Sequence, residues 1–442
     1  MASQSTLPAG PTPPQHDPYA ALRIPAYRYY IAGWIISLIG LRIQSVAVAW
    51  EMYARTGDAL SLGLVGLAQA VPTMLLALPA GYLADKFDRS RLMMVSLIAS
   101  MVTSLALGVL SYTHGSVEWT YILLFLDASA VMLGRPARSA LLPQLVPAPI
   151  FANAVTWNTS MVQIASVAGP ALGGAVIIWH TSAAYLIAAF CSLLFLLLLI
   201  RLNLQSRSER ASGASLATLL AGIEFVWNKR ILLTMISLDL FAVLLGGAVY
   251  LLPIFAEDIL KVGPTGFGWL RAAPAIGAFC MAALLIYLPP LKRAGWSLLL
   301  NVAGFGVATI VFGLSTSFGL SFLMLFLTGA FDNVSMVIRG TMQQLLTPDH
   351  MRGRVSAVTS VFVGASNELG GLESGMMAHW FGPVFSVVSG GIGTLVVVAV
   401  SAFAAPELRA LGGMNMPVAA TEVVKPASTL VNAPVQAAAN GD

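Results

Sequence analysis

Residues 60–91 read LSLGLVGLAQAVPTMLLALPAGYLADKFDRSR. The first 23 of these positions, 60–82, contain no charged residue, whereas five of the next nine, 83–91, are charged. A helix that crosses a bilayer needs about 20 mostly apolar residues. The stretch therefore predicts a membrane-spanning helix that ends in a short, charged loop.

The whole chain is rich in apolar residues and poor in charged ones. Of its 442 residues, 57% are hydrophobic and 10% are charged, compared with about 25% charged residues in an average soluble domain. So few polar side chains cannot cover a water-soluble globule. The formal charge of +4 is spread along the chain, which argues against a nucleic-acid-binding surface. We therefore expect a polytopic integral membrane protein that sits in a lipid bilayer.

Twelve apolar stretches are long enough to span a bilayer. They are continuously apolar, whereas the strands of a membrane β-barrel alternate over about ten residues. The fold class that we expect is an all-α membrane protein with twelve transmembrane helices. The predicted spans are 29–53, 60–82, 92–112, 120–138, 152–178, 183–201, 232–255, 266–286, 296–314, 320–338, 355–379 and 384–404.

The basic residues predict the orientation of these spans. With both termini in the cytoplasm, Arg55 and Lys261 lie outside and Arg42 and Arg271 lie within spans, which leaves 19 of the 23 Lys and Arg residues on the cytoplasmic side. Cytoplasmic loops of membrane proteins carry such an excess. We expect a protein of the cytoplasmic membrane.

The longest internal hydrophilic stretch divides the chain into two pseudo-symmetric halves. We expect six-helix bundles at 27–201 and 231–404, a cytoplasmic linker at 202–230, and disordered cytoplasmic tails at 1–26 and 405–442. Within the linker, residues 216–226 fit either an amphipathic helix on the membrane surface or a simple tether.

A shift of 201 residues aligns parts of the two halves. It places Arg138 on Arg339, Pro147 on Pro348, Gly169 on Gly370 and Gly174 on Gly375. Weak internal symmetry of this kind is expected of transporters that are built from repeats.

The loop after the second span carries a recognisable motif. It resembles the signature loop of the major facilitator superfamily, Gly-x-Leu-Ala-Asp-Arg-x-Gly-Arg-Arg/Lys, although Asp88 replaces the second glycine. The resemblance implies a cytoplasmic gating loop in which Asp85 latches the two halves in one state. The matching residues are Gly81, Leu83, Ala84, Asp85, Arg89 and Arg91.

The fifth span carries a second motif, Gly169-Pro170-Ala171-Leu172-Gly173-Gly174. Small residues four apart let two helices approach closely, and a proline bends its helix. The motif resembles the glycine-proline motif of antiporters in this superfamily, although a packing role without a part in transport is the alternative. Gly371 and Gly375 form a related pair in the eleventh span.

A longer resemblance, from about Arg28 to Ala404, narrows the family. Residues 136–146, 152–154, 251–256 and 352–355 are similar to the enterobactin-exporter and macrolide-efflux branch of the superfamily. The branch implies a secondary active transporter by alternating access, and more narrowly a proton-coupled antiporter for efflux of siderophores or amphiphilic drugs.

Ionisable side chains within spans are costly and usually face a bundle interior or a cavity. Removal from water favours the neutral form of a carboxylic acid, which suits a group that takes up and releases protons. The candidates for proton coupling are Asp127, Asp239, Asp332 and Glu368. A structural pair with an arginine is the alternative for each of them. Other charges within spans are Arg42, Glu51, Arg271 and Glu373.

A substrate cavity is expected between the halves, at the bilayer midplane. Aromatic, methionine and amide side chains of the spans are its candidate lining residues: Trp34, Gln44, Asn158, Phe241, Asn333 and Met336.

The sequence does not indicate an enzyme. It lacks a Gly-x-Ser-x-Gly elbow, a His-Glu-x-x-His motif and a phosphate-binding Gly-x-x-x-x-Gly-Lys-Ser/Thr loop, and its histidines and cysteines fit no metal-ligand spacing. We expect a monomer without cofactor or metal that binds a small-molecule substrate and protons. A lysolipid flippase and a non-transporting membrane sensor of the same fold are the alternatives.

Overall fold

The structure, a computed structural model, describes residues 17–202, 216–289, 293–409 and 412, and all regular structure in them is helical. The first half contains α1 (Pro25–Thr56), α2 (Ala59–Lys86), α3 (Arg89–Tyr112), α4 (Val117–Leu145), α5 (Phe151–Ile177) and α6 (Thr181–Leu202). The second half contains α8 (Arg230–Leu245), α9 (Leu252–Ile254), α10 (Gly263–Tyr287), α11 (Ala294–Leu314), α12 (Phe318–Leu346), α13 (Asp349–Phe381), α14 (Pro383–Ala404) and α15 (Pro406–Arg409), and α7 (Leu216–Asn228) joins the halves.

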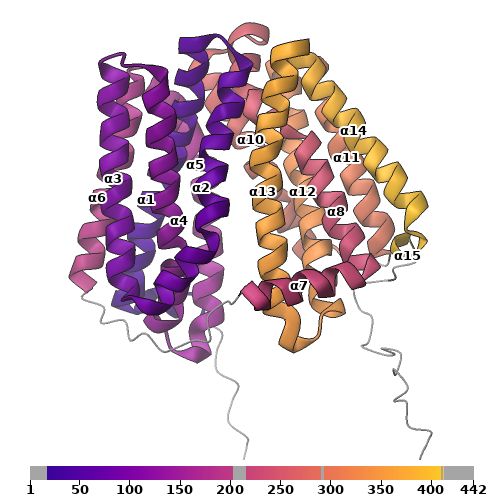
Figure 1. Ribbon diagram of the computed structural model, residues 1–442, viewed down its shortest axis with the longest axis horizontal. Helices are drawn as coiled ribbons and strands as arrows, with labels where there is room; N and C mark the ends of the chain where they lie inside the picture. The colour runs from indigo at the N-terminus through magenta and orange to yellow at the C-terminus, as the bar shows by residue number, and fades with distance from the viewer. Residues whose placement is uncertain (1–16, 203–215, 290–292, 410–411, 413–442) are drawn as a thin grey trace, which may run out of the picture.

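Eleven stretches of the described chain are long and apolar enough to cross a membrane, and they coincide with eleven of the predicted spans. The remaining predicted span, 355–379, lies in α13, a helix of 33 residues that runs the height of the bundle (Figure 1). α13 packs against α2 of one half and against α8 and α14 of the other. Its polar residues therefore need not face lipid, and the helix can be more polar than the other spans.

The seventh span is interrupted, whereas a single span was predicted at 232–255. α8 ends at Leu245, and Gly246 and Gly247 begin a 3₁₀ turn (Gly247–Leu251) that leads into α9 and a π-helical turn (Phe255–Ile259). A Cβ atom at Gly247 would lie 2.6 Å from the Gly370 carbonyl oxygen of α13. The close approach of the two backbones therefore requires glycine at the break.

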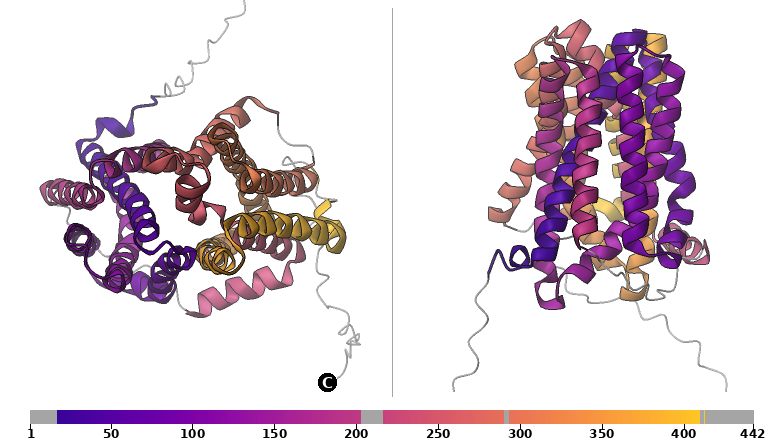
Figure 2. Two further views of the ribbon diagram at one scale, coloured as in Figure 1. Left: turned by 90° about the horizontal axis from the view of Figure 1, so that it is seen from above. Right: turned by 90° about the vertical axis from the view of Figure 1, so that its left-hand side faces the viewer.

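The two halves lie side by side with their helices roughly parallel (Figures 1 and 2). We call "upper end" the end of the bundle with the α1–α2 loop at Gly57 and the α13–α14 loop at Gly382. The "lower end" is the opposite one, which carries α7 and α15 (Figure 1).

Two glycine contacts join the halves in their upper part. A Cβ atom at Gly174 of α5 would lie 2.5 Å from the Pro264 carbonyl oxygen of α10. A Cβ atom at Gly375 of α13 would lie 2.8 Å from the Gly63 Cα of α2. The shift of 201 residues relates both partners, since it places Gly63 on Pro264 as well as Gly174 on Gly375. The repeat seen in the sequence is thus a repeated contact between the halves.

Hydrophobic packing follows the same division. One buried cluster draws on both halves and includes Val46 and Met52 of α1 with Phe255 and Phe267 of the second half. The clusters of the lower end each draw on one half among the described residues, with Leu141 at the centre of the first-half cluster. The halves are therefore packed together in their upper part and separate below.

The predicted tails were too long where the structure can be compared with them. Residues 1–16, 410–411 and 413–442 lie outside the described residues, but residues 17–26 pack on the first half, where the Pro18 carbonyl accepts hydrogen bonds from Asn153 and Trp157. Leu408 of α15 is fully buried in the second half. These polar and apolar contacts hold residues against the bundle that composition alone assigned to the tails.

The linker contains the amphipathic helix that was one of two interpretations of residues 216–226. α7 lies across the lower end (Figure 1), and Val226 packs against Val355 and Val358 of α13. The linker residues 203–215 lie outside the described part of the chain.

The glycine contact makes the first prediction. Gly375→Ala forces the backbones of α2 and α13 apart, so the state in which the upper parts are packed should lose population. Spin labels on Trp119 and Trp380, which are exposed near the upper end of α4 and α13, should report longer distances than in the parent protein. Gly364→Ala in the same helix is the control, because a Cβ atom there meets nothing within 4 Å. Equal distances in both variants would contradict the contact's role.

Candidate functional site

In the first half, Asp127 of α4 is enclosed by hydrogen-bond donors. The Ser100 and Thr103 hydroxyls of α3 donate to its Oδ1 at 2.7 and 2.9 Å, and the Gln44 amide of α1 donates to its Oδ2 at 3.1 Å. The Gln44 Oε1 in turn accepts from Ser104. Asp127 is 8% exposed and has no ion-pair partner among the described residues. Such a carboxyl can exchange a proton without breaking an ion pair.

In the second half, Arg339 of α12 holds two carboxylates. It forms an ion pair with Asp239 of α8 and lies 3.5 Å from Asp332, two helix turns earlier on α12. Asp239 is buried, whereas 43% of the Asp332 side chain is exposed. Both acids line a small pocket with Asn301, Phe305 and Phe331. Protonation of either acid would leave the arginine with the other.

The repeat relates two arginines with different partners. Arg138 of α4, the counterpart of Arg339, stacks its guanidinium 3.8 Å from the centre of the Trp34 ring of α1. Each arginine thus reaches from the fourth helix of its half to the first, but it meets an aromatic ring in one half and a carboxylate in the other. The halves share a scaffold and differ in charge.

At the break in the seventh span, a third group of polar side chains lies between the halves. The Tyr250 hydroxyl donates to Glu368 Oε2 of α13 at 3.2 Å, and Arg271 of α10 donates to the Val249 carbonyl at 2.7 Å. A Cβ atom at Gly66 of α2 would lie 3.7 Å from the same Glu368 oxygen. Tyr250 was not predicted as a site residue, because the sequence does not reveal the break that exposes the carbonyl of its neighbour Val249.

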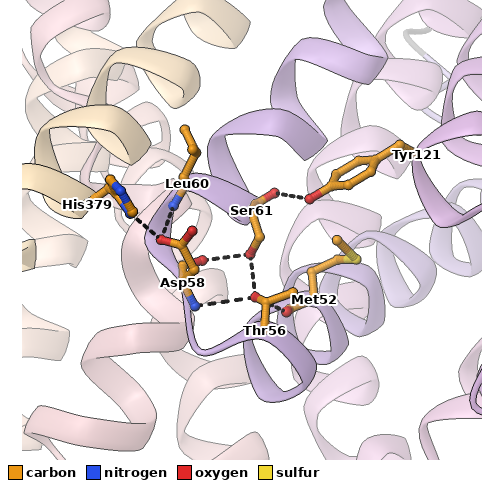
Figure 3. Close-up of polar contacts among 7 residues, drawn as sticks. All are labelled: Met52, Thr56, Asp58, Leu60, Ser61, Tyr121 and His379. Atoms are coloured by element: carbon orange, nitrogen blue, oxygen red, sulfur yellow. Dashed lines mark hydrogen bonds and ion pairs between the residues drawn. The ribbon is translucent and has the colours of Figure 1, made fainter. Parts of the chain in front are cut away.

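At the upper end, a hydrogen bond between a carboxylate and an imidazole bridges the halves. Asp58 caps the N-terminus of α2 by accepting from the Leu60 amide at 3.0 Å, and its Oδ1 lies 2.7 Å from His379 Nδ1 of α13 (Figure 3). Nearby, Tyr53 of α1 donates a hydrogen bond to Asp258 of the second half. Partial burial raises the pKa of Asp58, but the bonds from Leu60 and His379 outweigh it and hold the net pKa below its usual value.

The predicted gating loop lies at the lower end, between α2 and α3. The Asp85 side chain lies outside what the structure describes, so its latching role stays a prediction. Gly81 has open space around it, Leu83 is half-buried and Arg91 is exposed. Asp88, which departs from the motif, caps α3 by accepting from the Arg91 amide at 2.8 Å, while Arg89 is the first residue of that helix.

The structure brings only some of the predicted site residues together. Gln44 and Asp127 form one cluster and Asp239 and Asp332 another, but Glu368 stands apart from both. The predicted packing glycines lie at helix contacts: Gly169 and Gly173 face α1, Gly174 faces α10, Gly371 faces Tyr250 and Gly375 faces α2, and Pro170 is buried beside Gly169.

Trp34 and Gln44, which were predicted to line the cavity, lie inside the first half. Both are buried, since the face of α1 that carries them packs on α6 and α3 and not on the other half. Phe241 and Met336 are exposed, and Asn158 and Asn333 are half-buried. These four residues stay candidates for the lining of a cavity.

Comparison with known families agrees with this architecture. The profile of the family described as "transmembrane secretion effector" matches residues 16–431. The chain belongs to this family. It is therefore a multi-pass secondary transporter of the major facilitator superfamily, not an enzyme, and it acts on a small molecule within a lipid bilayer.

Several transporters are similar to the chain over most of its length. The staphyloferrin A transporter of Staphylococcus aureus is 24% identical over 86% of this chain and 97% of its own. The multidrug efflux pump Tap of Mycolicibacterium fortuitum is 26% identical over 86% and 95%. The enterobactin exporter EntS of Escherichia coli is 26% identical over 87% and 93%.

Solved structures show the same fold at low identity. A bacterial homologue of the human lysosomal transporter Spinster, in an inward-facing and unoccupied conformation, matches with a TM-score of 0.69, at 16% identity over 87% of this chain and 98% of that one. A peptide transporter of the POT family matches with a TM-score of 0.71, at 12% identity over 88% and 95%.

The ion pair in the second half makes the second prediction. Arg339→Gln leaves Asp239 buried without a counter-charge, so the protein in detergent should lose about 3–5 kcal/mol of stability against unfolding. Adding Asp239→Asn should restore part of the loss. Arg138→Gln is the matched control in the other half, because it leaves no carboxylate unpaired and should cost about 1 kcal/mol. Similar losses for both arginine variants would contradict this assignment.

The upper-end pair makes the third prediction. Asn caps a helix about as well as Asp, so Asp58→Asn removes the charge that faces His379 and keeps the α2 cap. It should weaken the packed upper end by about 1 kcal/mol or less, because the pair is partly exposed, and the same spin-label distances should report the shift. A carboxyl whose pKa is lowered in the packed state stabilises that state at pH values above its ordinary pKa and loses this effect as the pH falls below it. The difference between parent and variant should therefore vanish as the pH falls below about 4, and a difference that persists there would contradict the pair.

Proposed function

We propose that the protein exports a siderophore-like or amphiphilic small molecule across the cytoplasmic membrane in exchange for protons. The observation that carries the proposal is the arrangement of its halves, which are packed at one end alone around symmetric glycine contacts. Alternating access needs two such bodies that rock about a midplane site. The halves at 27–201 and 231–404, joined by the linker at 202–230, would be these bodies, in a monomer.

The orientation of the protein in the membrane can be inferred from its basic residues. We infer that the lower end faces the cytoplasm, because basic residues gather there: Lys86 at the end of α2, Arg89 and Arg91 in the first turn of α3, and Arg352 and Arg354 at the start of α13. In that orientation the described state is closed to the outside. An impermeant maleimide should then label Trp380→Cys in intact cells and Lys229→Cys only in inverted vesicles, and the reverse pattern would reject this orientation.

Proton coupling is supported by the carboxyls that lie within the bundle. Asp127 is surrounded by neutral donors alone, which permits a neutral or a charged form, and is the first candidate. Asp239 and Asp332 share Arg339, so that one can be neutralised while the other keeps the pair, and Glu368 lies beside the break in the seventh span. The export of siderophores or drugs by the named relatives supports the substrate class.

Inverted membrane vesicles test this function and supply the fourth prediction. Uptake of enterobactin, staphyloferrin A or erythromycin should rise several-fold when the vesicle interior is made acidic, and a protonophore should remove the rise. Among Asp127→Asn, Asp239→Asn, Asp332→Asn and Glu368→Gln, the variant of the proton carrier should lose the response to the gradient but keep exchange of labelled for unlabelled solute. Glu373→Gln is the control. Uptake of every solute that ignores the gradient would reject proton coupling.

A further inference from the structure

Most acidic and basic side chains deep in the described part of the bundle have partners. Glu51 pairs with Arg55, Asp239 and Asp332 with Arg339, and Glu368 with Tyr250. Arg42, midway along α1, makes no hydrogen bond or ion pair with any described residue, yet its side chain is exposed. An arginine keeps its charge in proteins, and an unpaired charge at this depth is costly. Its guanidinium is therefore available to a partner from outside the chain.

Arg42 points toward the second half. Gly40, two residues earlier, packs against Cys191 of α6, since a Cβ atom there would lie 2.7 Å from the Cys191 Cβ. Two residues are about 200° around a helix, so Arg42 faces away from α6. Its own Cβ lies against Gly169 of α5, where a Cβ atom would approach it to 2.3 Å.

Arg271 approaches the same place from the other half. It lies one turn below Gly268 of α10, and Gly268 abuts Pro170 of α5, where a Cβ atom would lie 2.6 Å from the Pro170 carbonyl oxygen. The two arginines thus lie on opposite sides of Gly169 and Pro170, one in each half. Glu368 of α13 lies on the side of Arg271, since Tyr250 donates to Glu368 and its ring lies 5.9 Å from the Arg271 guanidinium carbon.

The charges at this place do not balance. Arg271 lies near one carboxylate, Glu368, which already accepts a hydrogen bond from Tyr250, and Arg42 makes no ion pair with a described residue. Arg271 uses one of its five N–H donors on the Val249 carbonyl, which leaves the others free. Planar guanidinium donors match the oxygens of a carboxylate, phosphate or sulfonate. Between the halves there is accordingly a site that lacks one negative charge.

We propose that Arg42 and Arg271 bind an oxyanion group of the transported solute, one arginine from each half. The inference rests on the proposed transport function and names its substrate class, an amphiphile with at least one carboxylate, sulfonate or phosphate. A solute held in this way contacts both halves. Its oxyanion would attract both arginines and so favour the approach of the halves around it.

Binding to the full chain in phosphatidylcholine nanodiscs tests this inference. The probes are 8-anilinonaphthalene-1-sulfonate and its uncharged analogue N-phenyl-1-naphthylamine, which have the same aromatic skeleton, and empty discs give the background. Arg42→Gln and Arg271→Gln should each raise the Kd of the sulfonate about tenfold or more, because each removes a charge-assisted contact. The Kd of the uncharged probe should stay within about twofold, which also shows that the variants are folded.

Arg201→Gln, at the lower end of α6, is the control for loss of one positive charge. The proposal fails if both arginine variants bind the sulfonate as the parent does, or if they weaken both probes equally. The binding measurement needs no proton gradient. If the sulfonate binds as expected but transport ignores an imposed pH difference, the oxyanion site is supported and proton coupling is rejected.

A second arm identifies the source of the oxyanion. Discs that contain one-third phosphatidylglycerol present an anionic headgroup at the same concentration to parent and variant. If the headgroup competes with the sulfonate in the parent but not in Arg42→Gln, the oxyanion site belongs to a lipid-like solute. If it does not compete, the site belongs to a solute that arrives from water.

Discussion

The rest of the structure depends on the contact of bare backbones between the halves. Where α5 meets α10 and α13 meets α2, there is no room for a side chain, and glycine supplies the missing volume. Such a contact orders few side chains when it forms, so it loses little conformational entropy. It can be made and broken at modest cost, which suits a joint that must open in every cycle. The hydrophobic cluster shared by the halves and the pair of Asp58 with His379 surround this joint and do not replace it.

Each half treats its buried charges in a different way. In the first, Asp127 is satisfied by hydroxyl and amide donors, and Arg138 rests on the Trp34 ring. In the second, the arginine at the equivalent place holds Asp239 and Asp332. A duplicated scaffold thus carries two unlike polar networks. Midway along α1, beside the contact of α5 with α10, Arg42 makes no hydrogen bond or ion pair with the described chain.

The fold was largely predictable because lipid imposes simple rules. Length, apolarity and the distribution of basic residues located the spans, and the repeat at Gly174 and Gly375 pointed to what became the joint. The sites were less predictable. Hydropathy cannot tell which face of α1 meets which neighbour, so Trp34 and Gln44 were assigned to a cavity although they pack inside one half. The break at Gly246 and Gly247 escaped notice because two glycines in an apolar run also fit a continuous helix, and with it Tyr250 was missed.

The π-helical turn at Phe255–Ile259 has a geometric consequence. It holds more residues per turn than an α-helix, and a return to regular α-helical hydrogen bonding would rotate the segments on its two sides by about 100° relative to each other. On one side of this turn lies Tyr250, next to Glu368, and within it lies Asp258, which bonds to Tyr53 of the opposite half. A change of hydrogen-bond register in these five residues would thus rotate one segment relative to the other. It would turn the Tyr250 hydroxyl relative to its acid as the tie to α1 is released, with no bend of the long helices on either side.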